Sequence, residues 1–329
     1  MDGVRRKLVL MAAVVTVTSA STIVGQAAEM EYPRRPVRII VPLGAASAVD
    51  LLTRVLAQGL SEAWGQQFVV ENRPGAAGTV GAQSVAKAAP DGYTLLVTTN
   101  APLTTNLALY RDLDYSWKDF EPILVVAQAP VVLVVNNSLA VRSVTDLVAV
   151  SKATPSGLSV ATTGNGSIGH FVISDLRRTR GANLANVPYR GGVPGVSAVS
   201  TGEVQAGVLD TGAATSFILD GRVRPLAIVG DHRSPRLPDV PTLAELGISG
   251  ADIIAWVGLV APKGTPKEIV HKLAAQVAAQ LRDPQVRQKF EEAGVEPVDG
   301  STPERFAGFL RDEVARWRQR VQDAGLKLE

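Results

Sequence analysis

The fold is decided by residues 37–64, which read VRIIVPLGAASAVDLLTRVLAQGLSEAW. The β-branched run at 37–41 predicts a buried strand, and the apolar residues repeated every four positions from Leu52 to Trp64 predict a helix over 50–64. A loop of small residues joins the two. A strand, a short loop and a helix make up the first part of a βαβ unit, which predicts an α/β fold with mainly parallel sheets.

The same alternation continues along the chain and predicts two lobes. Further strands are expected at 67–71, 93–98, 158–163, 186–190, 204–209 and 223–229, with helices at 79–88, 143–152, 169–179, 193–201 and 213–220. The remaining C-terminal sequence is expected to be helical with no strand of its own. Helices of that kind need a sheet to cover, so we infer that the chain returns to the first lobe.

This return predicts lobe one at 29–126 and 252–329 and lobe two at 127–251. The apolar extended runs 122–135 and 252–260 supply the two crossing segments, near 122–130 and 250–258. Paired crossings between lobes make a hinge with a cleft beside it. Two consecutive domains with a static interface are the alternative.

The N-terminus reads as a secretory signal peptide over residues 1–28, with cleavage after Ala27 or Ala28. Basic residues precede an apolar run at 8–15 that is too short to span a membrane. Its removal would take away three basic residues and one acidic residue and leave a net charge of zero. Because the chain has 0 cysteines, it offers no disulfide, thiol chemistry or lipid attachment. We therefore expect a soluble periplasmic protein, a monomer that binds no nucleic acid.

Two helix-opening loops are the candidate binding site. The first includes Ala46, Ser47 and Asp50, where Asp50 is expected to cap the helix. The second, GNGSIGH at 164–170, includes Gly164, Gly166, Ser167 and His170. Unpaired amides at a helix start carry about half a positive charge and suit a carboxylate. Open α/β sheets bind ligands at the carboxyl ends of their strands. Thr99, Asn100 and Asp210 follow predicted strands, so we add them to the candidate site.

Other chemistry fits this sequence less well. The run 164–169 matches G-x-G-x-x-G, but the stretch 183–195 holds no acidic residue for a ribose, which argues against a nucleotide. It also misses the nucleophile elbow G-x-S-x-G, because Asn165 stands at the first glycine position. The 3 histidines are scattered, without a metal-binding motif. No catalytic residue, metal or cofactor is predicted.

Several segments resemble the Bug family, the periplasmic substrate-binding receptors of tripartite tricarboxylate transporters. They read YPRRPVRIIVP (32–42), VENRPGAAG (70–78), APDGYTLL (89–96), VPYRG (187–191), LPDVPT (237–242) and APKGTP (261–266). The resemblance implies a two-lobed α/β periplasmic-binding-protein (Venus flytrap, type II-like) fold that closes on a small carboxylate. It also adds Tyr189 to the predicted ligand-binding residues. The first loop departs from the family's glycine-rich pattern, because alanines occupy 45, 46 and 48.

We therefore predict a non-catalytic receptor that delivers a small organic carboxylate to membrane transporter subunits. Two alternatives stay open: a ligand-sensing module for a membrane signalling protein, and an enzyme of the serine-hydrolase or nucleotide-dependent type.

Overall fold

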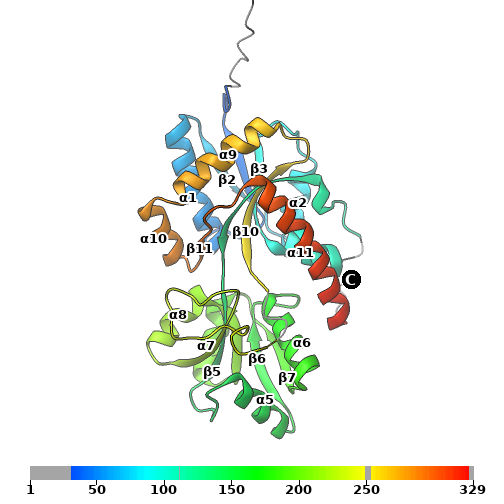
Figure 1. The fold of residues 1–329 in the computed structure, drawn as a ribbon, viewed down its shortest axis with the longest axis vertical. Helices are drawn as coiled ribbons and strands as arrows, with labels where there is room; N and C mark the ends of the chain where they lie inside the picture. The colour runs from blue at the N-terminus through cyan, green and yellow to red at the C-terminus, as the bar shows by residue number, and fades with distance from the viewer. Residues whose placement is uncertain (1–30, 111, 249–252, 326–329) are drawn as a thin grey trace, which may run out of the picture. The chain divides into compact units, whose positions relative to one another are not determined.

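The computed structural model describes residues 31–110, 112–248 and 253–325 (Figure 1). The predicted signal peptide at 1–28 lies outside the described residues. Every helix and strand below belongs to the compact unit Tyr32–Glu329.

The described strands form two sheets. Sheet 1 has six strands in the order β11-β4-β10-β3-β1-β2, and sheet 2 has five in the order β7-β6-β8-β5-β9. Their bounds are β1 Val37–Val41, β2 Phe68–Asn72, β3 Thr94–Thr99, β4 Phe120–Gln128, β5 Val131–Asn136, β6 Leu158–Thr162, β7 Leu184–Pro188, β8 Ala206–Asp210, β9 Val223–Val229, β10 Trp256–Pro262 and β11 Glu296–Pro297.

Both sheets are mixed, whereas the βαβ pattern predicted mainly parallel pairing. In sheet 1, β1 pairs in parallel with β2 and β3, but β10 runs antiparallel to both β3 and β4. In sheet 2, β6 pairs in parallel with β7 and β8, but β5 runs antiparallel to β8 and β9. Strands β5 and β10 each come directly after a segment that crosses between the sheets. Each therefore runs in the direction opposite to its neighbouring strands, which are β8 and β9 for β5 and β3 and β4 for β10.

Helices cover both faces of each sheet. Ile39 belongs to the core beneath α1 and α9, while Ile40 belongs to the core beneath α2 and α11, as expected for successive residues of a strand. In sheet 2, Leu133 packs in the core with α5 and α6, and Val132 in the core with α7. The helices are α1 Ala48–Trp64, α2 Thr79–Ala86, α3 Asn100–Leu103, α4 Thr105–Leu109, α5 Val144–Ala153, α6 Ile168–Arg180, α7 Gly192–Thr201, α8 Thr211–Leu219, α9 Lys267–Gln280, α10 Pro284–Glu292 and α11 Pro303–Ala324, with short 3-10 turns at Ala76–Gly78 and Trp117–Asp119. The α/β class is confirmed.

The chain passes between the sheets at two places. Residues 129–130 join β4 of sheet 1 to β5 of sheet 2, within the apolar run 122–135. The return follows β9 and reaches β10 of sheet 1 at Trp256, and residues 249–252 on this path lie outside the described residues. A backbone hydrogen bond from Ala129 N to Ala255 O, at 2.8 Å, joins the two crossings side by side.

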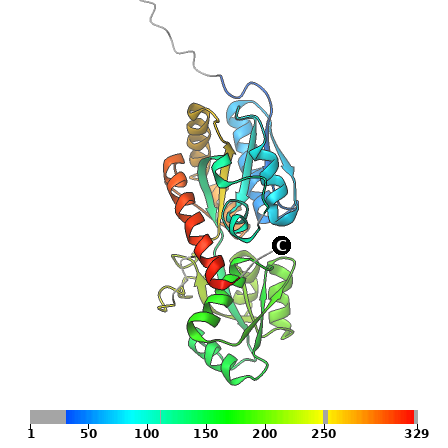
Figure 2. The ribbon, with the colours of Figure 1, turned by 90° about the vertical axis from the view of Figure 1, so that its right-hand side faces the viewer.

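The C-terminal segment departs from the prediction in two ways. It holds the two-residue strand β11, which pairs with β4, although no strand was expected there. Helix α11 also reaches beyond sheet 1 (Figure 2): Phe306 and Leu310 pack in a core of sheet 1, whereas Trp317 and Val321 pack in a core of sheet 2. The ring of Trp317 meets Phe171 of α6 with centroids 4.9 Å apart. The apolar face of α11 is long enough for its first half to pack on sheet 1 and its second half to pack on sheet 2.

Candidate functional site

A cleft lined by residues of both sheets has a cavity volume of about 820 Å³. The starts of α1, α6 and α7 form parts of its wall. This volume suits a small organic ligand. Among the predicted site residues, the cleft is lined by Ala46, Ser47, Thr99, Asn100, Gly166, Ser167 and Asp210. The structure places Asp50, Gly164, His170 and Tyr189 outside this lining.

The start of α1 presents free amides to the cleft. Ser47 is the N-cap, with extended backbone (φ −67°, ψ 157°) and a hydroxyl that accepts a hydrogen bond from Asp50 N at 3.2 Å. The expectation that Asp50 begins and caps this helix is wrong, because Asp50 is its third residue. The amides of Ala48 and Val49 have no acceptor within the helix, so they can bind an anion.

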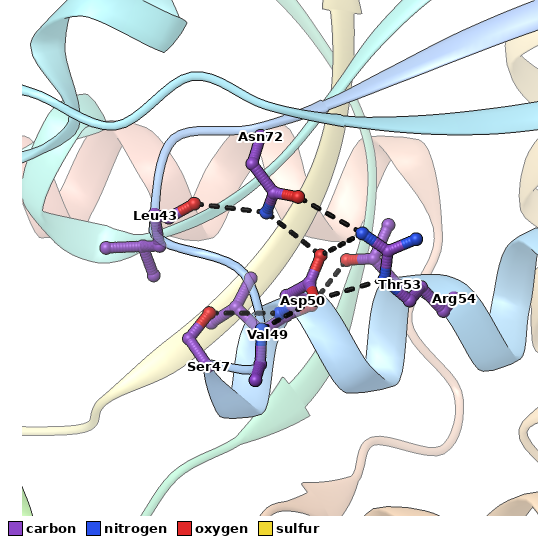
Figure 3. Close-up of polar contacts among 8 residues, drawn as sticks. Leu43, Ser47, Val49, Asp50, Thr53, Arg54 and Asn72 are labelled. Carbon is purple, nitrogen blue, oxygen red and sulfur yellow. Dashed lines mark hydrogen bonds and ion pairs between the residues drawn. The ribbon is translucent and has the colours of Figure 1, made fainter.

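The carboxylate of Asp50 holds the loop before α1 in place (Figure 3). It is 2% exposed and accepts hydrogen bonds from Ala46 N at 2.9 Å, Asn72 Nδ2 at 2.9 Å and Arg54 Nε at 3.0 Å. Burial opposes the charged form, but the hydrogen bonds from Arg54, Asn72 and Ala46 hold the pKa of Asp50 below its ordinary 3.8. Asn72 also donates to Leu43 O at 3.1 Å. Asp50 is therefore a positioning residue for the loop.

Asn72 was not among the predicted site residues. It ends β2, far from the first loop in sequence, and no local pattern signals its contact with Asp50.

Ala46 in the first loop adopts a left-handed backbone conformation. Its φ is 62°, in the left-handed region, which costs a residue other than glycine roughly 1–2 kcal/mol. The loop therefore needs this conformation even though no glycine supplies it. The hydrogen bond from Ala46 N to the buried Asp50 carboxylate offsets part of that cost.

The start of α6 repeats the design of α1. Ser167 is the N-cap (φ −71°, ψ 163°), and its hydroxyl accepts from His170 N at 3.4 Å. His170 stands third in the helix, as Asp50 does in α1, and its Nδ1 accepts from Gly166 N at 3.2 Å. Gly164 and Gly166 adopt φ values of 136° and 74°, which glycine takes readily. The free amides at this start belong to Ile168 and Gly169.

His170 holds the second loop through its ring nitrogen and does not line the cleft. Burial, together with the nearby Arg177 guanidinium, lowers the pKa of His170 below 6.5. The imidazole is therefore neutral near pH 7, and its Nδ1 has a lone pair for the Gly166 amide.

The remaining predicted residues fall into two groups. Thr99 and the buried Asn100 lie in the cleft at the end of β3. Asp210 lies in the cleft at the end of β8, and part of its surface is exposed to the cavity. Protein atoms surround its carboxylate closely, and this desolvation raises the pKa of Asp210. Tyr189 instead donates its hydroxyl hydrogen to Glu203 at 2.8 Å, outside the cleft.

The predicted site residues included neither the start of α7 nor two indoles of the cleft lining. Gly191 has a φ of 108° and caps α7 at the cleft. Trp256 and Trp317 line the cleft, and both donate from Nε1 to the buried carboxylate of Glu313, at 3.2 and 3.1 Å. The two glycines at 191–192 were a local signal for the helix start. The shared contact of the two indoles had no such signal, because Trp256 and Trp317 lie far apart in the sequence.

The two sheets also meet at one side of the cleft. Gly212 in α8 and Gly294 after α10 approach so closely that a Cβ on Gly212 would lie 2.7 Å from Gly294 Cα. Nearby, His232 after β9 binds Asp231 at 2.5 Å and Glu296 of β11 at 2.7 Å. Backbone contact and an ionic contact thus join elements of sheet 1 to elements of sheet 2.

The described part of the chain holds neither a metal-binding cluster nor a helix suited to crossing a membrane. Its residues include no cluster of three or more His, Asp or Glu side chains arranged to hold a metal ion. Among the described helices, none combines the length and hydrophobicity that crossing a membrane requires.

Comparisons with known proteins agree on one family. The model of the tripartite tricarboxylate transporter family receptor matches residues 52–326. Protein BugT of Bordetella pertussis is 37% identical over 300 residues, covering 91% of this chain and 92% of BugT. A solved R. palustris protein with adipate has a TM-score of 0.79 and 35% identity, covering 90% of this chain and 99% of the other. The periplasmic binding protein BugD has a TM-score of 0.76 and 32% identity, covering 91% of this chain and 100% of BugD. The predicted two-lobed periplasmic-binding-protein fold is confirmed.

Proposed function

The chain belongs to the family of tripartite tricarboxylate transporter receptors, the Bug family, and from this premise we propose that it captures a small carboxylate and delivers it to a membrane transporter. It is a periplasmic solute-binding receptor and not an enzyme. One observation carries the proposed binding mode: two helices, one from each sheet, begin at the same cleft with matched serine caps and free amides. The related R. palustris protein was solved with adipate, which supports a carboxylate as the ligand.

The proposed mechanism is closure by differential affinity. A carboxylate that touches the starts of both α1 and α6 makes its full set of contacts only when the lobes approach, so the ligand favours the closed form. The crossings at 129–130 and 253–255 serve as the proposed hinge between the two predicted lobes. Because β4 of sheet 1 runs to Gln128, the first segment of lobe one extends to 128 and not to 126 as predicted. Small-angle scattering with and without saturating adipate tests this mechanism, and a radius of gyration unchanged by the ligand would contradict it.

The substitution Ser167→Asp tests the binding site. Aspartate caps a helix about as well as serine, so α6 should persist, but the new anion stands where the ligand carboxylate binds. Like charges about 4 Å apart repel by ~4 kcal/mol at an effective dielectric constant of about 20, which predicts an affinity loss of at least about 100-fold. Isothermal titration calorimetry with adipate and malate measures the loss.

Ser143→Asp is the matched control, because Ser143 caps α5 in the same way, away from the cleft lining. It should leave affinity unchanged. Undiminished binding in the Ser167→Asp variant would refute the site.

Delivery and export complete the proposal. Deletion of the receptor should abolish carboxylate uptake; unchanged uptake would instead favour a sensor for a membrane signalling protein. Export through the signal peptide at 1–28 should leave a periplasmic monomer without a lipid anchor. Mass spectrometry of the periplasmic protein should find a new N-terminus after Ala27 or Ala28, and sedimentation should give the monomer mass.

A further inference from the structure

Two exposed aliphatic side chains line the cleft, one from a helix on each sheet. Leu51 follows Asp50 in the first turn of α1 and is 46% exposed, and Val193 lies in the first turn of α7 and is 59% exposed. Single exposed apolar residues are common on protein surfaces. These two, however, line the same ligand-sized cavity, one from a helix on sheet 1 and one from a helix on sheet 2.

The wall around them is mostly apolar. Leu43, Val131, Ile168, Pro194 and Val208 also line the cleft. Apolar surface of this kind gains free energy when a ligand displaces its water, at about 25 cal/mol per Å². A ligand composed only of polar groups would leave this gain unused.

The charged side chains of the cleft also favour a ligand with an uncharged body. Three charged side chains line it: Arg190, Asp210 and Glu292. Two of these are acidic, and the carboxylate of Asp210 has no hydrogen-bond or ion-pair partner among the described residues. A ligand whose one carboxylate sits at the helix starts, and whose remainder is uncharged, avoids bringing a second anion near these acids.

We infer that the preferred ligand is a monocarboxylate with a hydrocarbon body, either an aliphatic chain or an aromatic ring, which packs between Leu51 and Val193 when bound. This inference rests on the proposed function and narrows its ligand class. In a closed cleft the two side chains would form an apolar clamp beyond the carboxylate, so they determine specificity while the amides supply the anion site.

A calorimetric series on the full mature chain tests the ligand class, with butyrate, hexanoate, benzoate, adipate and malate as probes. Each buried methylene contributes ~0.8 kcal/mol, so hexanoate should bind about tenfold more tightly than butyrate. Hexanoate should also bind more tightly than adipate, which has the same number of carbons and a second carboxylate. Tighter binding of malate or adipate than of hexanoate would overturn the inference.

The double variant Leu51→Asn with Val193→Thr tests the clamp. It should reduce the hexanoate-to-butyrate preference to about twofold or less, because the side chains that cover the extra methylenes become polar. The matched control is Leu219→Asn with Val69→Thr, which alters exposed residues outside the cleft and should keep the full preference. An unchanged preference in the Leu51 and Val193 variant would overturn the inference while leaving the proposed function intact. If none of the five acids binds, the proposed function itself fails.

Discussion

Replacing Asp50 with asparagine should lower the free energy of unfolding by about 2–3 kcal/mol. The wild-type carboxylate accepts hydrogen bonds from Ala46 N, Asn72 Nδ2 and the Arg54 guanidinium. An asparagine side chain has one acceptor oxygen and one NH2 group, so its NH2 must face a donor that the carboxylate had satisfied. One buried donor is then left without an acceptor.

The magnitude follows from these contacts. An unsatisfied buried donor costs about 1–3 kcal/mol, and hydrogen bonds to a charged group contribute about 1.5–3 kcal/mol each against roughly 1 for neutral ones. The Arg54 ion pair adds little, because the guanidinium is 50% exposed and such pairs contribute under about 1 kcal/mol. The sum is about 2–3 kcal/mol.

Urea unfolding at neutral pH measures this loss, and Asp146→Asn is the matched control. Asp146 is third in α5 after the cap Ser143, and its carboxylate accepts from Arg142 N at 3.0 Å. It lacks an ion pair or an amide side-chain partner among the described residues, so its replacement should cost less. A loss at Asp50 no larger than that at Asp146 would refute the reasoning.

The pH dependence of the stability difference between wild type and Asp50→Asn tests the same prediction. Because the folded pKa of Asp50 lies below its ordinary 3.8, its stabilisation is present above pH 3.8 and is lost as the pH falls through the folded pKa. The wild type and the Asp50→Asn variant should therefore converge in stability at strongly acidic pH. A difference that stays constant down to that range would exclude the ionised carboxylate as its cause.

Two further predictions concern the contacts between the sheets. Gly212→Ala would place a Cβ 2.7 Å from Gly294 Cα and should lower stability by about 1–3 kcal/mol in thermal unfolding, whereas Gly308→Ala, with open space around it, should not destabilise the protein. Burial opposes the charge on His232, but hydrogen bonds to Glu296 and to the adjacent aspartate raise its pKa above 6.5. Its stabilisation is therefore full below pH 6.5 and lost as the pH rises through the folded pKa, so the melting temperature of the wild type should approach that of His232→Gln above that pKa.

Local patterns in the sequence predicted most of the elements and part of the site. The strand 37–41 is observed at those bounds, and the helix predicted over 50–64 begins two residues earlier because Ser47, rather than Asp50, is its cap. Side-chain periodicity and capping act over a few residues, so they can be read from a short window. The two helix-opening loops around 44–50 and 164–170 were found in this way, but their serine caps were not predicted.

Contacts between distant segments could not be predicted in the same way. The Asn72 amide reaches Asp50 only because β2 lies beside β1 in register, so that Asn72 pairs with Val41. The antiparallel entry of β10 into sheet 1 also has no local signature, because an apolar strand has the same pattern in either direction.

The sequence by itself determined most of the helices and strands and the two helix-opening loops, because backbone periodicity and small-residue turns depend on near neighbours alone. Tertiary structure decided that both helix starts open into one cleft, that α11 packs on both sheets and that Leu51 and Val193 line the same cavity. Those arrangements arise from burying apolar faces that lie far apart in the chain, and the partner of each face is chosen only when the whole chain folds.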